Sequence, residues 1–273
     1  MNTVERQQLP IGIFDSGVGG LTVLKAIRDE LPRERLVYLG DTARLPYGTK
    51  SPASISRYAC QAAAKLQQQG IKLLVVACNT ASAVALQALR EQLQPLPVIG
   101  VVGPGAAAAV AARPAGAHLV LATEATVGLG AYRRALKELD PAATVSELAC
   151  ELLVALAEEG WTDGDIASTI VRRYLAELPD RAFRPDSVIL GCTHFPLLRE
   201  PIARAFADDV AIVDSASTTA SYVRQMLAKM DLLGDNEPSL RLLATDGASR
   251  FARVGGRFLD QDLTAADIEI VDL

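Results

Sequence analysis

Residues 9–31 read LPIGIFDSGVGGLTVLKAIRDEL, and this stretch decides the fold that we expect. Leu9–Phe14 is a short aliphatic run, which is typical of a buried strand. A glycine-rich turn follows at residues 15–20. Leu21–Leu31 then carries apolar residues at helical spacing until Pro32 ends the segment. The stretch therefore predicts a strand, a tight turn and a helix, which together form the unit of a layered α/β fold.

The same alternation continues along the chain. We expect further strands at Leu36–Leu39, Ile71–Ala77, Val98–Val102, His118–Ala122, Thr144–Leu148, Val188–Leu190, Val210–Val213 and Leu240–Ala244. We expect helices at Ala53–Gln69, Ala81–Leu93, Leu129–Leu139, Leu152–Glu159, Asp163–Leu178, Leu197–Phe206 and Ala248–Val254. Strands buried on both faces of a parallel sheet have continuous aliphatic sequences. The pattern therefore predicts an α/β protein with mostly parallel sheets.

One long internal similarity divides the chain. Residues 73–80 read LLVVACNT, and residues 188–194 read VILGCTH. Each segment is an aliphatic strand followed by a small residue, a cysteine and a hydroxyl residue. Two similar open α/β domains that face each other across a cleft would explain this similarity. Chance is the alternative explanation, because the shared pattern is short.

The composition excludes several classes of protein. The 273 residues are half hydrophobic and carry a net charge of −5, so neither a disordered chain nor a basic nucleic-acid-binding face is expected. The apolar runs are too short to span a membrane, and the polar N-terminus lacks the pattern of a signal peptide. The chain has four cysteines without a Cys-x-x-Cys pair and only two histidines, which argues against a disulfide framework and a zinc site. We expect a cytoplasmic protein with free thiols.

Two of the cysteines stand where reactive thiols are found. Cys78 and Cys192 each follow a predicted strand and open a predicted helix. The positive potential of a helix N-terminus lowers the pKa of a nearby thiol. The alternative is that both are inert core residues, because cysteine is often buried. Their matched placement favours reactive thiols, whereas Cys60 and Cys150 lack this setting and are expected in the core or on a helix face.

Two thiols on facing domains suit the inversion of a carbon centre by proton exchange. A thiolate on one face would remove the α-proton of an amino acid, and a thiol on the other face would deliver a proton. Asp15 is expected to assist a cysteine as a base, to accept a substrate ammonium or to cap the next helix. His194 would hold or relay the proton of Cys192. Tyr47 would cover the site or only pack within its turn.

These residues carry a resemblance to a known family. Over nearly its whole length the chain resembles the cofactor-independent glutamate racemases of the aspartate/glutamate racemase superfamily. The motifs that carry the resemblance are IGIFDSGVGGL (11–21), GDTARLPYG (40–48), ACNTAS (77–82), GCTHFPLL (191–198), VDS (213–215) and TDGASRF (245–251).

The resemblance implies interconversion of L- and D-glutamate for peptidoglycan precursors, with no pyridoxal cofactor or metal. From the charge and the short apolar runs, we expect no nucleic-acid or membrane partner. It implies that Cys78 and Cys192 are the acid/base residues, with Asp15 assisting the first and His194 the second. It places residues 1–99 and 212–273 in one domain and residues 100–211 in the other, and it suggests a homodimer. The residues implied to contact glutamate are Asp15, Ser16, Tyr47, Gly48, Asn79, Thr80, Thr123 and Thr193.

Glu158 marks a segment where the resemblance is weaker. From its place on a predicted amphipathic helix, we expect Glu158 to be a solvated surface residue. It aligns with a glutamate of the family, but Glu151 and Ala155 stand where the family usually has prolines. A role in the site is therefore not assigned to Glu158.

Two alternatives remain open. The first is the same chemistry on aspartate or another amino acid, since one methylene changes binding by only about 1–3 kcal/mol. The second is a non-catalytic binding or regulatory protein in which the cysteines are vestigial. The preference for glutamate rests on the resemblance.

Overall fold

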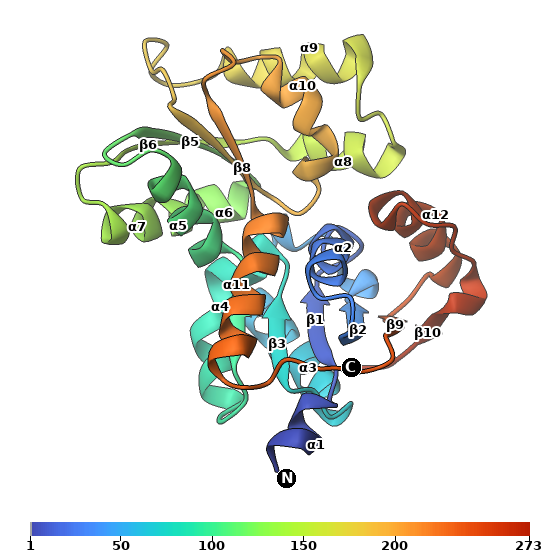
Figure 1. Ribbon diagram of the computed structural model, residues 1–273. Helices are drawn as coiled ribbons and strands as arrows, with labels where there is room; N and C mark the ends of the chain where they lie inside the picture. The colour runs from blue at the N-terminus through green and yellow to red at the C-terminus, as the bar shows by residue number, and fades with distance from the viewer. Residues whose placement is uncertain (1) are drawn as a thin grey trace.

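The computed structural model describes residues 2–273 and contains two separate β-sheets (Figure 1). The larger sheet has the strand order β10-β9-β2-β1-β3-β4, and the smaller sheet has the order β6-β5-β7-β8. Neighbouring strands in both sheets run parallel. This architecture confirms the predicted α/β class with mostly parallel sheets.

The predicted strands and helices occur in the predicted order. The sequence did not predict the helices at Thr3–Gln7, Val102–Ala112, Glu124–Gly128 and Ser215–Lys229 or the strand at Ile268–Ile270. The strands are β1 (Ile11–Asp15), β2 (Arg35–Gly40), β3 (Leu73–Val76), β4 (Val98–Gly100), β5 (Ala117–Ala122), β6 (Thr144–Ala149), β7 (Ser187–Gly191), β8 (Ala211–Asp214), β9 (Ser239–Ala244) and β10 (Ile268–Ile270). The α-helices are α1 (Thr3–Gln7), α2 (Leu21–Glu30), α3 (Pro52–Gln68), α4 (Asn79–Gln92), α5 (Val102–Ala112), α6 (Glu124–Gly128), α7 (Ala131–Leu139), α8 (Glu151–Glu159), α9 (Gly164–Leu175), α10 (Arg199–Ala203), α11 (Ser215–Lys229) and α12 (Ala248–Leu259). The short 3₁₀ helices are η1 (Thr42–Arg44), η2 (Tyr47–Thr49), η3 (Phe195–Leu198) and η4 (Ala265–Asp267).

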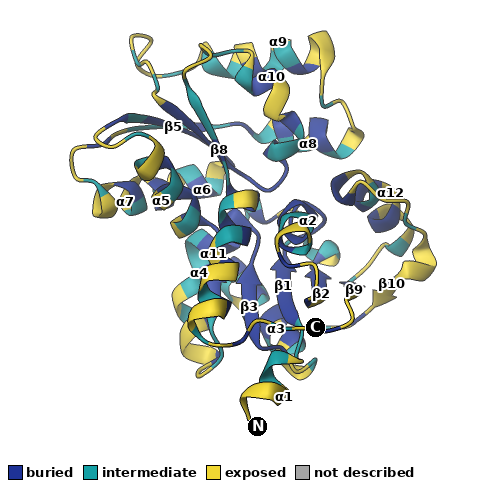
Figure 2. Cartoon of the chain, in the orientation of Figure 1, coloured by how far each residue is buried: buried dark blue, intermediate teal, exposed yellow. Residues whose placement is uncertain are grey.

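Helices cover both faces of the larger sheet, which explains its continuous aliphatic strands. Ile11 and Ile13 on β1 belong to the same apolar core as Leu24 of α2. Phe14 points to the opposite face, where it packs with Ile55 of α3. Successive strand residues alternate between the two faces, so a strand covered on both sides needs apolar residues at every position. Figure 2 shows these strands as buried and the outer faces of the helices as exposed.

The chain crosses between the two sheets from β4 to α5 and returns from β8 to α11. Helix α5 packs against β7 and β8 of the smaller sheet and also against α11, while α11 packs against α2 beside the larger sheet. The predicted division at residues 99 and 211 stays a prediction. Strand β8 lies across the second of these limits and pairs with β7 in the smaller sheet.

Most predicted elements differ from the structure by a few residues at their ends, and α12 continues past the predicted Val254 to Leu259. The strand predicted at Val98–Val102 ends at Gly100, and α5 begins at Val102. Pro104 lies in the first turn of that helix, where its missing N–H is harmless, so it does not interrupt the helix. The helix predicted at Leu129–Leu139 begins only after Gly130, whose φ of 58° is left-handed. The segment Leu197–Phe206 forms η3 and the short α10 rather than one helix.

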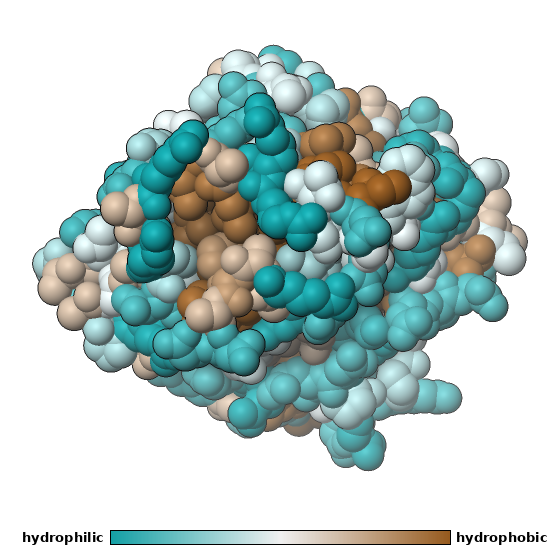
Figure 3. Space-filling view, turned by 90° about the horizontal axis from the view of Figure 1, so that it is seen from above, coloured by the Kyte–Doolittle hydropathy of each residue, from teal (hydrophilic) through white to brown (hydrophobic). Residues whose placement is uncertain are grey.

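The surface above the smaller sheet is mostly hydrophilic. Seen from that end of the molecule, hydrophilic side chains surround several separate apolar patches (Figure 3). The exposed large apolar residues of the region include Leu152, Trp161 and Ile166. Within residues 2–273, none of the helices combines the length and the apolar character needed to cross a membrane.

Candidate active site

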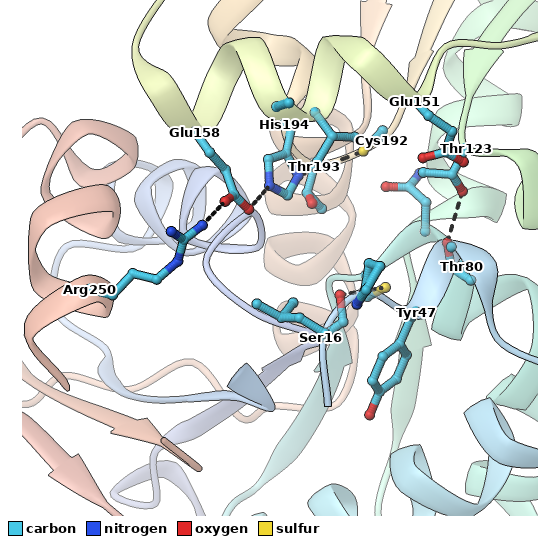
Figure 4. A pocket seen from close by; sticks show the side chains of 17 residues that line it. Ser16, Tyr47, Thr80, Thr123, Glu151, Glu158, Cys192, Thr193, His194 and Arg250 are labelled. Atoms are coloured by element: carbon cyan, nitrogen blue, oxygen red, sulfur yellow. Dashed lines mark hydrogen bonds and ion pairs between the residues drawn. The ribbon is translucent and has the colours of Figure 1, made fainter. Parts of the chain in front are cut away.

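A cavity of about 360 Å³ lies between the two sheets and contains both predicted thiols in its wall. Figure 4 shows Cys192, Thr193 and His194 on one side of this cavity and Ser16 and Tyr47 on the other. Of the predicted site residues, all but Asp15 line the cavity. They are Ser16, Tyr47, Gly48, Cys78, Asn79, Thr80, Thr123, Cys192, Thr193 and His194. The structure thus brings together residues that lie up to 178 positions apart in the sequence (194 − 16).

Cys78 stands between the end of β3 and the start of α4. Its sulfur accepts a hydrogen bond from the Ala81 amide at 3.4 Å and caps the helix, and its thiol donates to Oγ of Ser16 at 3.5 Å. The lowered pKa that we expected for this thiol is wrong. Burial and then the charge of Asp15 raise the pKa of Cys78 to about 12, although the bonds to Ser16 and Ala81 act in the opposite direction. Cys78 is therefore a neutral thiol in this state.

Asp15 lies behind Cys78 rather than in the cavity wall. It ends β1 and is 1% exposed. Its Oδ2 accepts from the amide of Gly17 at 2.8 Å, whereas Oδ1 has no hydrogen-bond partner. Burial raises the pKa of this carboxyl above its usual range, and the charge of His194 only partly offsets that effect. Asp15 does not cap α2, because the capping position is Gly20.

The glycines of the first turn allow the two halves of the site to touch. A Cβ atom on Gly19 would collide with Thr193 and His194, and a Cβ on Gly20 would collide with Asp15. The hydroxyl of Thr22 donates to the backbone oxygen of Thr193 at 2.8 Å, which fixes this contact. The turn therefore serves close backbone approach rather than phosphate binding.

Cys192 follows β7 and lies beside His194. Nδ1 of His194 is 3.7 Å from Sγ of Cys192, and Nε2 is 3.2 Å from Oε1 of Glu158. Burial alone would lower the pKa of His194, but hydrogen bonds to Cys192 and Glu158 outweigh it and raise the pKa to about 10. The imidazole is therefore a cation at neutral pH. A short 3₁₀ helix, not an α-helix, follows this cysteine.

The expectation that Glu158 is a solvated surface residue is wrong. Its side chain is 17% exposed and lies in the cavity wall. Hydrogen bonding to His194, more than the charges of His194 and Arg250, lowers the pKa of this carboxyl below its usual value despite burial. Leu153 and Leu156 of α8 face the core, whereas Glu151, Ala155 and Glu158 face the cavity. This spacing of about one helical turn is a signal that could have located Glu158.

Hydroxyl and amide groups complete the wall between the two thiols. Oγ1 of Thr80 on α4 is 3.0 Å from Oγ1 of Thr123 at the end of β5, so this pair bridges the two halves. Nδ2 of Asn79 donates to the hydroxyl of Tyr132 at 2.8 Å, whereas its Oδ1 is buried without a partner. A buried acceptor without a partner costs free energy, so this amide oxygen is unusual for a side chain at a folded core.

Tyr47 lines the cavity with its ring and turns its hydroxyl away from it (Figure 4). The hydroxyl donates to Oδ2 of the fully buried Asp41 at 2.6 Å. Next to it, Gly48 approaches Thr123 so closely that a Cβ atom would lie 3.3 Å from the threonine Cβ. The turn at 46–48 therefore both covers the site and packs tightly, which were the two alternatives for Tyr47.

Sequence position alone did not separate reactive from structural cysteines. Cys150 also follows a strand, β6, and occupies the position before α8, contrary to our expectation that it lacks this setting. It is fully buried outside the cavity, and burial raises its pKa to about 12. Cys60 lies half-buried on α3, as predicted. The sequence analysis also missed Glu151 and Arg250, which line the cavity.

Comparisons with known proteins agree on one family. The family model described as Asp/Glu/Hydantoin racemase matches residues 18–223. A glutamate racemase from Geobacter metallireducens is 48% identical over 251 residues, which cover 91% of this chain and 92% of the relative.

Solved structures lead to the same family. The glutamate racemase isoform RacE1 from Bacillus anthracis is 38% identical, with a TM-score of 0.91 and 98% coverage of both chains. The glutamate racemase from Francisella tularensis, solved in complex with D-glutamate, is 35% identical, with a TM-score of 0.89 and coverage of 97% of this chain and 98% of that one. Since the family model and these relatives span most of its length, the chain belongs to the Asp/Glu/Hydantoin racemase family, as its motifs indicated.

Proposed function

We propose that this protein interconverts L- and D-glutamate by moving the α-proton between two cysteines, and that it thereby supplies D-glutamate for peptidoglycan synthesis. The observation that carries the mechanism is that Cys78 and Cys192, at the ends of strands in separate sheets, line one small cavity. The choice of glutamate rests on relatives such as the glutamate racemases from Geobacter metallireducens, 48% identical, and Francisella tularensis, 35% identical.

In the proposed reaction the imidazolium of His194 stabilises a thiolate on Cys192, while Cys78 is a thiol. The thiolate removes the α-hydrogen as a proton, and the electron pair of the C–H bond moves toward the substrate carboxylate. The Cys78 thiol then delivers its proton to the opposite face of the carbon. The roles exchange in the reverse direction, in which the raised pKa of Asp15 suits it to accept the proton of Cys78.

Charge that develops on the substrate carboxylate needs donors already in place. The first N–H groups of α4, at Asn79 and Thr80, have no partner within the helix. The hydroxyls of Thr80, Thr123 and Thr193 also face the cavity. Fixed donors in a cavity shielded from water stabilise developing negative charge by several kcal/mol.

The test is polarimetry or circular dichroism of D-glutamate and D-aspartate with the purified protein. We expect the optical signal of D-glutamate to decay to zero as the racemate forms. With the Cys78→Ser, Cys192→Ser double variant, the signal should persist. Faster turnover of aspartate would instead assign the protein to that substrate. No turnover of either amino acid would leave the binding or regulatory alternative. Activity is expected to persist in a metal chelator, without pyridoxal absorbance.

A further inference from the structure

Helix α12 joins the larger sheet to the part of the site that surrounds Cys192. Nη2 of Arg250 donates to Oε2 of Glu158 at 2.6 Å, and Nη1 of Arg257 donates to the backbone oxygen of the same residue at 2.8 Å. The ring of Phe258 packs edge-on against the imidazole of His194, with centroids 5.2 Å apart. One helix therefore contacts both Glu158 and His194 at three separate points.

The side chains that lead from α12 to the sulfur of Cys192 alternate in charge. Arg250 contacts one oxygen of Glu158, and the other oxygen contacts His194, whose second nitrogen faces Cys192 (Figure 4). Arg250 thus fixes the Glu158 carboxylate, and the carboxylate stabilises the imidazolium of His194. Hydrogen bonds that involve charged groups are short and directional, so the pairing with Arg250 restricts the rotation of this carboxylate.

We propose that Arg250 is a positioning residue, which holds the Glu158 carboxylate against His194 and so maintains the imidazolium beside Cys192. The role of Arg250 in catalysis rests on the function proposed above, but its effect on the protonation of His194 does not. Arg250 would act through Glu158 and support only one of the two thiols.

Two effects of Arg250 on His194 oppose each other. Its positive charge disfavours the imidazolium, whereas its ion pair secures the carboxylate that favours it. The side chain of Arg250 is 57% exposed, so water screens the repulsion, while Glu158 and His194 meet at 17% and 11% exposure. The other charged groups that face His194 are Cys192 and Asp15. We therefore expect the loss of the ion pair to dominate, and His194 to release its proton more easily.

The direct test is NMR titration of the two histidines in Arg250→Gln. The pKa of His194 should fall from about 10 by about one unit or more. His118 is an internal reference, because it lies on β5 and bonds to Ser187 outside the cavity. Arg250→Lys should restore most of the shift. Arg257→Gln is the matched control, since it removes a tether from the same helix to Glu158 but leaves the carboxylate pair intact.

Kinetics provide the second measurement. In Arg250→Gln we expect the basic limb of the pH profile of kcat for racemisation to move down by about one pH unit, with KM changed less than twofold. Near pH 10 kcat should then fall severalfold, whereas at neutral pH it should change little because His194 stays protonated in both proteins. An unchanged or raised His194 pKa would overturn the proposal. So would an equal shift in Arg257→Gln, or a higher KM with an unchanged pKa, which would make Arg250 a substrate ligand. If the wild type lacks racemase activity, the proposed function fails, but the titration still tests the role of Arg250.

Discussion

The two thiols of the cavity are surrounded by opposite electrostatics. Cys78 lies beside the buried carboxyl of Asp15, and both burial and this charge favour its protonated form. Cys192 lies beside His194, whose pKa of about 10 makes it a cation at neutral pH. Both are nearly equally buried, at 5% and 6% exposure, so burial does not explain the difference.

The comparison indicates that two cysteines at similar positions in similar folds can be suited to the two opposite steps of one reaction, proton removal and proton delivery. A carboxylate neighbour suits a thiol that delivers a proton, and an imidazolium neighbour suits a thiolate that removes one. In the proposed mechanism, the resting protein is then prepared for one enantiomer of the substrate. The other enantiomer requires the net transfer of one proton from Cys78 to Cys192 first. The predictions below test this asymmetry.

The largest effect is expected from the cysteines themselves. Replacing either Cys78 or Cys192 by serine should reduce racemisation by roughly a factor of 1,000 or more, since each direction needs both groups. Each single variant should still eliminate HX from one enantiomer of a suitably substituted glutamate, and the two variants should prefer opposite enantiomers. Cys60→Ser, outside the cavity, is the control. Undiminished racemisation by Cys192→Ser would end the two-thiol mechanism.

The neighbours of the thiols come next. Asp15→Asn and His194→Asn should each lower kcat by roughly a factor of 100, typical of a lost acid–base group. Because the equilibrium constant between enantiomers is unity, kcat/KM must fall equally in both directions. Substrate deuterium isotope effects separate the two sides. Asp15→Asn should raise the deuterium isotope effect for one enantiomer, and His194→Asn should raise it for the other. If both variants raised the isotope effect for the same enantiomer, the assignment would be contradicted.

Glu158 allows a matched comparison with its neighbour in the sequence. Glu158→Gln keeps the shape of the side chain but removes the charge that faces His194, and we expect kcat to fall about tenfold. Glu159→Gln makes the same change on the exposed side of α8 and should leave kcat unchanged. Equal effects of the two substitutions would mean that net charge, rather than contact with His194, matters.

The last prediction concerns the stability of the fold, not the rate, as a function of pH. The pKa of His194 is about 10 in the folded protein, above the unfolded value of about 6.5, so its stabilising contribution is complete below pH 6.5. This contribution is lost as the pH rises toward 10. Urea unfolding at several pH values should show that the wild type loses several kcal/mol over this interval relative to His194→Asn, at about 1.4 kcal/mol for each unit of pKa shift. Parallel curves for the two proteins would contradict the raised pKa.

The sequence predicted much of the site because strand ends mark it. In a parallel sheet the carboxyl ends of the strands lie at one edge, so residues such as Cys78 and Cys192 could be recognised from their position after aliphatic runs. The same rule could not exclude Cys150, which also follows a strand but faces the core. Whether a thiol faces a core or a cavity depends on the neighbouring elements, which a local pattern does not contain.

The aliphatic runs and turn residues determined the α/β class by themselves, because strand and helix periodicities are local properties. Only the tertiary structure decided the charges of the site, because a pKa depends on burial and on partners distant in the sequence. Arg250 reaches Glu158 across 92 positions, and Lys72, within an apolar run, is fully buried against Glu34 at 2.6 Å. Burial, and after it the charge of Asp15, keeps Cys78 a neutral thiol, although its position before a helix predicted a lowered pKa.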